Sequence, residues 1–151
     1  MEAQRACLNF AADVLGAVPG PVLELGLGNG RTYDHLRDLF PERRIFVFER
    51  KVQAHPDCIP PDDDLFLGDF RETLPSAMAR MGEKAALVHA DYGAGTPDYV
   101  TEMSAFLAGT LEDLVAPGAL IVSDYPIAGA GWEERPLPEG IRPNRYFIRQ
   151  A

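Results

Sequence analysis

Residues 21–49 read PVLELGLGNGRTYDHLRDLFPERRIFVFE, and this stretch decides the fold. Val22, Leu23 and Leu25 predict a short strand that is covered on both faces of a sheet. Gly26, Gly28 and Gly30 follow directly, and they leave side chains out where the chain must turn sharply. The stretch therefore begins with a buried strand and a turn whose bare backbone a ligand can approach closely.

A helix and a second strand complete the stretch. Apolar residues recur at helical spacing over residues 31–40, and Pro41 ends the helix. The second strand is expected at residues 44–48, where four apolar residues follow Arg44, and it places Glu49 at its carboxyl end. In nucleotide-binding βαβ units an acid at this position accepts hydrogen bonds from ribose hydroxyls. Residues 21–49 are therefore interpreted as half of such a unit.

The glycine spacing separates the possible ligands of this turn. A dinucleotide fingerprint, G-x-G-x-x-G, would need glycine at position 31 when it is counted from Gly26. The chain has Arg31 there and a glycine one position earlier, at Gly30, which disfavours an NAD(P)-binding protein. A glycine turn also occurs in α/β proteins without any cofactor, and this alternative stays open.

Composition limits the class of protein. The chain has 151 residues, of which 46% are hydrophobic and 25% charged, as is ordinary for one globular domain over residues 1–151. A chain of this length buries about 68–70% of its unfolded surface. The formal net charge of −9 disfavours nucleic acid as a partner, because phosphate binding depends on clustered Lys and Arg.

The two cysteines and the hydropathy pattern indicate a compartment. Cys7 and Cys58 match no metal-binding or redox spacing, which predicts a reduced, cytoplasmic protein. The N-terminal segment carries Asn9 and Asp13 on an otherwise apolar side, unlike a signal peptide. No run approaches 18 apolar residues, so no membrane partner is expected.

The rest of the chain alternates strands with helical or irregular connections. Such alternation predicts an α/β fold with a doubly wound parallel sheet. The expected elements are an N-terminal helix within residues 1–20, an irregular crossover at 51–64, strands at 65–67, 85–90 and 119–123, helices within 69–82 and 97–114, a loop or lid at 126–144, and a last strand at 146–148.

Acidic residues follow four of the predicted strands. Glu49, Asp69, Asp91 and Asp124 each stand at or just after a strand's carboxyl end. Since ligands of open α/β sheets bind outside the carboxyl ends of the strands, these acids are expected at one site. Asp69 also fits the N-cap of a following helix. His89 lies inside a predicted strand, where a hydrogen-bonded core histidine is favoured over a catalytic base.

Several motifs together resemble a known family. The segment from Glu24 to Gly30, ELGLGNG, resembles the first motif of class I S-adenosylmethionine (SAM)-dependent methyltransferases. Residues 68–70, GDF, are similar to that family's segment after the third strand, and residues 87–91 and 117–124 are similar to small-molecule O-methyltransferases. The similarity runs from about residue 21 to 126. The chain also resembles a small, little-characterised group of bacterial SAM-dependent methyltransferases.

The resemblance implies a fold and an activity. The fold is a Rossmann-like, mostly parallel class I methyltransferase sheet, shortened after strand five because residues 126–151 leave room for little more than one further strand. The activity is methyl transfer from SAM to a small-molecule acceptor, with oxygen slightly favoured over nitrogen. A non-catalytic SAM-binding or regulatory module is the alternative from another class. An uncovered sheet edge would make a homodimer possible.

The resemblance also implies roles for particular residues. Asp91 and Asp124 match the two metal-site acids of metal-dependent relatives, but Tyr125 stands where those relatives carry Asn, which disfavours a metal site without excluding it. Asp91, Tyr92 and Asp124 are the catalytic candidates, nearest the expected methyl position. The implied cofactor-binding residues are Glu24, Gly26, Gly28, Asn29, Gly30, Thr32, Tyr33, Glu49, Asp69, Phe70 and Asp91.

Overall fold

The computed structural model describes residues 2–129 and 131–151. Its central unit is the predicted one: β1 (Val22–Leu25) leads through the glycine turn into α2 (Arg31–Leu39), and β2 (Ile45–Glu49) follows. β1 and β2 pair in parallel, with Val22 opposite Ile45. The prediction for residues 21–49 is confirmed.

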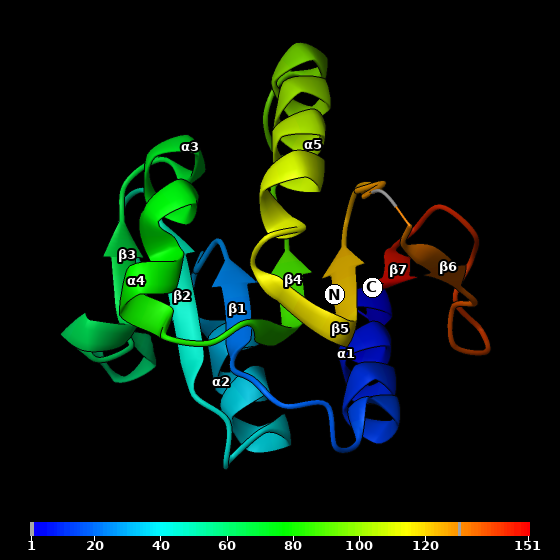
Figure 1. Ribbon diagram of the computed structural model, residues 1–151, viewed down its shortest axis with the longest axis horizontal. Helices are drawn as coiled ribbons and strands as arrows, with labels where there is room; N and C mark the ends of the chain where they lie inside the picture. The colour runs from blue at the N-terminus through cyan, green and yellow to red at the C-terminus, as the bar shows by residue number, and fades with distance from the viewer. Residues whose placement is uncertain (1, 130) are drawn as a thin grey trace.

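Within the described residues, seven strands form one sheet, in the order β3-β2-β1-β4-β5-β7-β6 (Figure 1). The first five strands in this order pair in parallel, and β7 pairs antiparallel with both β5 and β6. The chain runs outward from β1 to β3 and then returns to β4 on the other side of β1. This reversal of direction is the place where open α/β sheets bind ligands. The remaining strands are β3 (Leu65–Leu67), β4 (Ala85–Ala90), β5 (Val115–Ser123), β6 (Glu133–Arg135) and β7 (Phe147–Gln150).

Helices cover both faces of the sheet (Figure 1). α1 (Glu2–Leu15) and α2 pack on one face, where they share a buried cluster with alternate residues of the strands. α3 (Phe70–Thr73), α4 (Ala77–Met81) and α5 (Pro97–Leu111) cover the other. This is the doubly wound α/β architecture that the sequence predicts.

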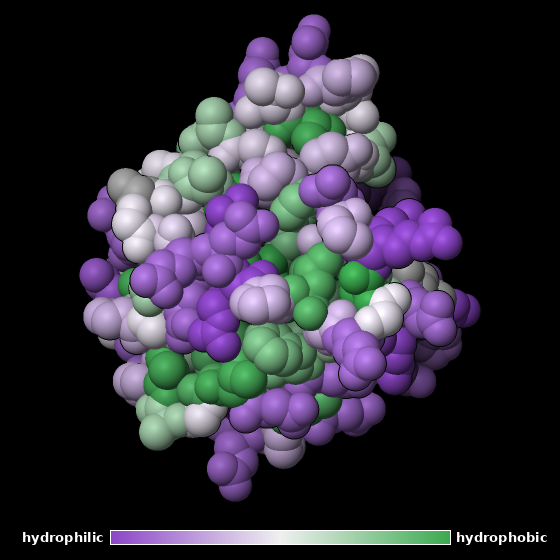
Figure 2. Space-filling model, turned by 90° about the vertical axis from the view of Figure 1, so that its right-hand side faces the viewer, coloured by the Kyte–Doolittle hydropathy of each residue, from purple (hydrophilic) through white to green (hydrophobic). Residues whose placement is uncertain are grey.

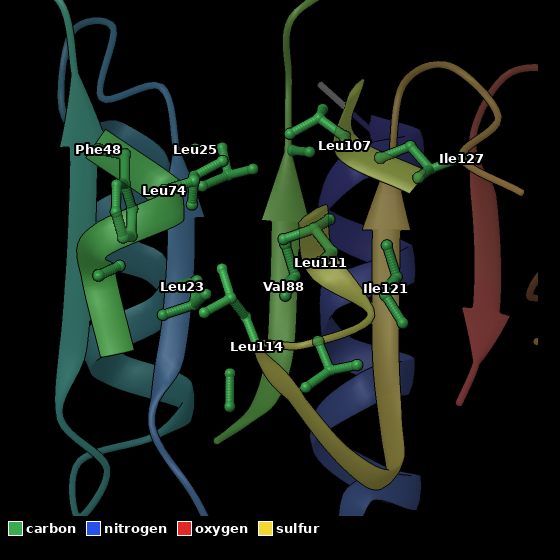
Figure 3. Close-up of a cluster of buried hydrophobic side chains, with 14 of the residues drawn as sticks. Leu23, Leu25, Phe48, Leu74, Val88, Leu107, Leu111, Leu114, Ile121 and Ile127 are labelled. Carbon is green, nitrogen blue, oxygen red and sulfur yellow. The ribbon is translucent and has the colours of Figure 1, made fainter. Parts of the chain in front are cut away.

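Strand alternation assigns side chains to the two layers. Leu23 and Leu25 of β1 point to the face covered by α3, α4 and α5, where they belong to one buried cluster with Leu74 and Leu107 (Figure 3). Val22 and Glu24 point to the opposite face, beneath α1, because successive strand residues alternate in direction. Both faces of β1 are therefore buried, and one of its buried residues carries a carboxyl group.

The C-terminal part of the sheet differs from the expectation. The predicted shortening to little more than one extra strand is wrong, because β6 lies inside the expected 126–144 loop and pairs with β7. β6 reads Glu-Glu-Arg and has no apolar alternation, so only its pairing with β7 makes it a strand. The predicted last strand at residues 146–148 is found as β7, one residue further along.

Other boundaries shift for local reasons. β5 begins at Val115, earlier than expected, because the strand passes through Pro117 and Gly118, which we expected to precede it. The pairing of β5 with β4 changes register in this part of the strand, where Gly118 has φ +83°. The helix expected within 69–82 is divided into α3, the 3-10 turn Leu74–Ser76 and α4, because Pro75 lacks a backbone N–H. α1 ends at Leu15. The 51–64 crossover holds only two 3-10 turns, Pro56–Cys58 and Asp62–Asp64, as predicted.

The surface on the β6–β7 side is mixed. Figure 2 shows hydrophobic residues reaching the surface there among hydrophilic ones. Across residues 2–129 and 131–151, no helix combines the length and the apolar character needed to cross a membrane.

Candidate functional site

A cavity of about 560 Å³ lies at the carboxyl ends of β1 to β4. Its position, next to the reversal of strand order between β1 and β4, is the one that the sheet topology predicts for a ligand. Its volume falls within the usual range of small-molecule sites. The lining residues are Gln4, Gly26, Leu27, Gly28, Asn29, Thr32, Glu49, Arg50, Gly68, Asp69, Phe70, Asp91, Tyr92, Tyr99 and Tyr146.

The glycine turn forms one wall of the cavity, and Glu49 holds it in place. The Glu49 Oε2 atom accepts hydrogen bonds from the backbone N–H groups of Leu27, at 2.6 Å, and Gly28, at 3.2 Å. Gly28 has φ +52°, and no atom lies within 4 Å of where its Cβ would be. The turn therefore presents bare backbone to open space, with a carboxylate beside it.

Asp69 forms the opposite end of the cavity and caps α3. Its Oδ1 atom accepts hydrogen bonds from the backbone N–H of Arg71 at 2.9 Å and from Arg71 Nε at 3.0 Å. These hydrogen bonds and the Arg71 charge lower the pKa of Asp69 to about 2. The N-cap role predicted for Asp69 is confirmed. Phe70, the next residue, contributes its side chain to the cavity wall.

Asp91 and Tyr92 line the cavity from the end of β4. Partial burial and the neighbouring Asp124 carboxylate raise the pKa of Asp91 to about 6. Asp124 itself accepts from the backbone N–H groups of Tyr92 at 3.2 Å and Gly93 at 2.9 Å, so it fixes the loop after β4. The Tyr92 hydroxyl lies 2.5 Å from Ser104 Oγ, and burial raises the Tyr92 pKa to about 12.

The structure gathers most of the sequence-predicted site residues in this one cavity. Four of them lie outside its lining: Glu24, Gly30, Tyr33 and Asp124. Gly30 backs onto the 51–64 crossover, where an added Cβ would lie 2.4 Å from Cys58 Cβ. Tyr33 is buried in the α1–α2 layer. Direct cofactor contact by Glu24, Gly30 and Tyr33 stays a prediction, as does a catalytic role for Asp124. The predicted residues that do line the cavity are Gly26, Gly28, Asn29, Thr32, Glu49, Asp69, Phe70, Asp91 and Tyr92.

Sequence reasoning missed four polar or aromatic lining residues: Gln4, Arg50, Tyr99 and Tyr146. α1 starts at the carboxyl edge of the sheet, which brings Gln4 of its first turn to the cavity (Figure 1). Arg50 directly follows the recognised acid Glu49, so its position offered a signal. Tyr146 precedes an antiparallel strand, and no local pattern connects it with the glycine turn.

A polar network lies beneath the cavity. The buried Glu24 and His89 are directly opposite each other on β1 and β4, with His89 Nδ1 2.8 Å from Glu24 Oε1. His89 Nε2 lies 2.7 Å from the Tyr146 hydroxyl. Gln4 Nε2 lies 3.4 Å from the same ring nitrogen and donates to Asp91 Oδ2 at 3.3 Å. The prediction that His89 is a hydrogen-bonded core residue is confirmed.

Burial and neighbouring charges shift the pKa values in this network in opposite directions. Burial raises the pKa of the Glu24 carboxyl. Burial alone would lower the pKa of His89, but the charge and hydrogen bond of Glu24, with Asp91 and Asp124 further away, raise it. Burial also raises the pKa of Tyr146, so this hydroxyl keeps its proton at neutral pH.

The cavity residues fit an adenosine-type cofactor better than a metal ion. Among the residues that the structure describes, no three His, Cys, Asp or Glu side chains gather as a metal site would require. The bare glycine backbone lets a ligand approach closely, and the Glu49 carboxylate can accept hydrogen bonds from ligand hydroxyl groups. At the other end of the cavity, Asp69 and Phe70 place an acid beside an aromatic ring. This set suits a ligand with a ribose and a flat base.

The fold and this cavity define a class of protein. A seven-stranded sheet with an antiparallel last strand and a glycine-turn site at its carboxyl edge is the class I methyltransferase arrangement that the sequence resembles. A family model described as S-adenosyl-L-methionine methyltransferase matches residues 1–151, and the chain belongs to this family. Its cofactor is therefore SAM, and its activity is SAM-dependent methyl transfer.

Solved structures agree with the family assignment. An S-adenosyl-L-methionine methyltransferase from Silicibacter pomeroyi is 46% identical, with a TM-score of 0.91 over 99% of this chain and 92% of that one. Human methyltransferase-like protein 13 is 16% identical, with a TM-score of 0.58 over 99% of this chain and 80% of that one. A putative methylase from Haemophilus influenzae is 12% identical, with a TM-score of 0.54 over 99% and 96%. The last two show the fold alone. No match is found among curated proteins.

Proposed function

We propose that this protein transfers a methyl group from SAM to a small-molecule acceptor, with oxygen favoured over nitrogen as the methylated atom. The observation that carries the proposal is the single cavity that combines the glycine turn and Glu49 with Asp91 and Tyr92. A volume of about 560 Å³ suits small ligands, and the formal net charge of −9 disfavours a nucleic acid acceptor.

The proposed cofactor contacts follow the wall of the cavity. The backbone at Gly26 to Gly30 lies against the methionine part, with Thr32 available to its carboxylate. Glu49 accepts from the ribose hydroxyls, and Asp69 accepts from the adenine amino group while Phe70 flanks the ring. The proposal is supported by the position of these residues along one cavity. Asn29 and Asp91 belong to the same proposed set, and so do Glu24, Gly30 and Tyr33, which lie outside the cavity lining.

The chain's own residues then align the acceptor. When bound, SAM supplies a methyl group on a positively charged sulfur, so the protein need only bind and orient the two reactants. We assign the acceptor to the side of Asp91 and Tyr92, the cavity end away from Asp69. Asp124 acts by holding the backbone of Tyr92 and Gly93 in place.

Calorimetric titration with S-adenosylhomocysteine tests the site. Glu49→Gln and Asp69→Asn each remove the charge that makes a carboxylate a strong acceptor, so each is expected to weaken binding about 10- to 100-fold. Asp38→Asn, an exposed acid on α2 outside the cavity, is the matched control and is expected to bind like wild type. Unchanged affinity in both cavity variants would exclude this binding mode.

Turnover is tested separately with radiolabelled SAM and a panel of phenols, catechols and primary amines. Methyl transfer to a phenol or catechol supports the proposal, and transfer only to amines would move the methylated atom from oxygen to nitrogen. Tight SAM binding with no transfer to any member would favour the alternative, a non-catalytic SAM-binding module.

Domain, location and assembly complete the proposal. We propose one domain over residues 1–151 in the cytoplasm, supported by the free thiols of Cys7 and Cys58. A homodimer is supported by β6, which ends the sheet and whose outer edge pairs with no other strand of the described residues. A lid formed by residues 126–144 stays a prediction; Trp132 in this segment packs against the core. Sedimentation at several protein concentrations tests the dimer.

A further inference from the structure

The buried pair formed by Glu24 and His89 is an unusual feature of this sheet. Glu24 is 1% exposed and His89 0%, and both lie on the face covered by α1, among apolar residues. Burying two ionisable groups is costly, and apolar residues of similar volume often serve stability as well or better. The second carboxylate oxygen, Glu24 Oε2, has no hydrogen-bond partner among the described residues. Packing alone therefore gives no reason for this pair.

The pair is connected to the cavity through Tyr146. The Tyr146 hydroxyl lies 2.7 Å from His89 Nε2, and Tyr146 contributes to the cavity wall. The Glu24 carboxylate, the His89 imidazole and the Tyr146 phenol thus form a continuous hydrogen-bonded row from the α1-covered face of the sheet to the cavity. The row ends next to Gln4 and Asp91, on the side assigned to the acceptor.

We propose that Tyr146, His89 and Glu24 form a proton relay that takes the proton released by the acceptor during methyl transfer. The inference rests on the proposed function and narrows its substrate: the acceptor carries a dissociable proton, as in a hydroxyl or amino group, at the cavity end formed by Gln4, Asp91 and Tyr146. Tyr146 is the catalytic residue, because it reaches the cavity. His89 and Glu24 are positioning residues that act through it.

The relay requires one arrangement of protons. His89 must be neutral with its proton on Nδ1, where it donates to the Glu24 carboxylate, so that Nε2 accepts from the Tyr146 hydroxyl. The Tyr146 oxygen then turns a lone pair toward the acceptor. Because burial raises the Tyr146 pKa, the phenol stays protonated at rest and hands its proton on only as it receives another.

The proton and electron count closes. The acceptor atom uses a lone pair to form the new bond to the methyl carbon, and the electrons of the carbon–sulfur bond remain on sulfur. The acceptor's proton passes to Tyr146 Oη, and the original Tyr146 proton passes to His89 Nε2. The imidazolium that results is stabilised by the Glu24 carboxylate 2.8 Å from Nδ1. After product release, this proton returns through Tyr146 to the cavity and solvent.

The relay makes methyl transfer depend on pH. The groups that face His89 are Glu24 of β1, Tyr146 before β7, the neutral Gln4 of α1, and the more distant acids Asp91 and Asp124. The three carboxylates favour the imidazolium and raise the pKa of His89. Below that pKa, a proton on Nε2 blocks the relay; above it, Nε2 is free to accept. The rate of transfer is therefore expected to rise with pH.

Nitrogen NMR of the histidine rings in the full chain tests the relay without any acceptor. The chain has three histidines, and His89→Gln identifies the His89 signals by their loss. The spectra are recorded from pH 5 to 9, with and without S-adenosylhomocysteine. We expect the pKa of His89 to lie above the ordinary value of about 6.5, and we expect the neutral ring at higher pH to carry its proton on Nδ1. Glu24→Gln is expected to lower this pKa. A proton on Nε2 throughout this pH range would overturn the relay.

Single-turnover transfer from radiolabelled SAM to the fastest panel acceptor gives the kinetic readout. Tyr146→Phe keeps the ring and is expected to bind S-adenosylhomocysteine normally, to lose about 10²-fold in rate and to lose the rise with pH. Tyr125→Phe, an exposed tyrosine outside this cavity lining, is the matched control. Equal rates and pH profiles in Tyr146→Phe and wild type would also overturn the relay.

The two proposals can fail independently. Wild-type protein that binds neither SAM nor S-adenosylhomocysteine contradicts the proposed function, whatever the protonation of His89. Normal cofactor binding with the wrong His89 tautomer contradicts only the relay. If no panel member is methylated, the tautomer measurement still decides the relay, because it uses the protein and S-adenosylhomocysteine alone.

Discussion

Gly30 offers a sharp test of how the glycine turn is held. It has φ +86°, and a Cβ added there would lie 2.4 Å from Cys58 Cβ and 3.0 Å from the Cys58 carbonyl oxygen. Carbon atoms in contact normally lie about 3.5–4.0 Å apart, so Gly30→Ala must push the 51–64 crossover away by about 1 Å or more. The left-handed backbone costs about 1–2 kcal/mol and the overlap about 1–3 kcal/mol, which together lower the free energy of unfolding by about 2–5 kcal/mol.

Gly28→Ala is the matched control for this substitution. Gly28 also has a positive φ, +52°, but no atom lies within 4 Å of the position that its added methyl group would take, so only the backbone cost of about 1–2 kcal/mol applies. The difference between the two variants therefore isolates the overlap with Cys58. Because Gly28 lines the cavity, its alanine variant is expected to lose S-adenosylhomocysteine affinity while it keeps more of its stability.

Urea unfolding and calorimetric titration measure both effects. Thermal unfolding gives a second measure of stability, since in a protein of this size each 1 kcal/mol of unfolding free energy corresponds to a change of about 2–4 °C in Tm. Equal destabilisation by Gly30→Ala and Gly28→Ala would refute the packing argument. It would mean that the crossover yields to the extra methyl without cost.

Two further predictions concern the core and the carboxyl edge. Leu107→Ala empties part of the buried α5 layer and is expected to lower the free energy of unfolding by about 2–5 kcal/mol, measured in urea; a loss under about 1 kcal/mol would contradict the packing in Figure 3. The fold favours the neutral form of Asp91, whose pKa is raised to about 6. Neutral Asp91 therefore contributes to the free energy of unfolding in full below about pH 4, and this contribution is lost as the pH rises through 6. Asp91→Asn is expected to remove this dependence; parallel stability curves from pH 4 to 8 would contradict it.

Local patterns were sufficient for the central unit. The apolar runs, the glycine turn, Pro41 and the acid Glu49 all act within a few residues of one another, so their spacing predicts β1, α2 and β2 directly. The acids after four strands predict a common site by the same logic, since parallel strands bring their carboxyl ends to one edge. Three of them, Glu49, Asp69 and Asp91, line the cavity.

Long-range packing decided the features that the sequence did not show. β6 has a fully polar sequence and is a strand only because β7 supplies its hydrogen bonds. Gln4 reaches the cavity because α1 starts at the carboxyl edge of the sheet. These placements depend on where whole elements pack, which local periodicity does not encode.

Glu24 shows the division most clearly. Its place in the first motif was evident from the sequence, and the motif's family was identified correctly. Only the tertiary structure turns its side chain beneath α1, pairs it with His89 on the neighbouring strand and adds Tyr146 from the far end of the chain. The sequence by itself determined the glycine turn, the strand-end acids and the cofactor class, because these depend on short-range spacing. The hydrogen-bonded row below the cavity was decided by the sheet register, because only strand pairing brings its three side chains together.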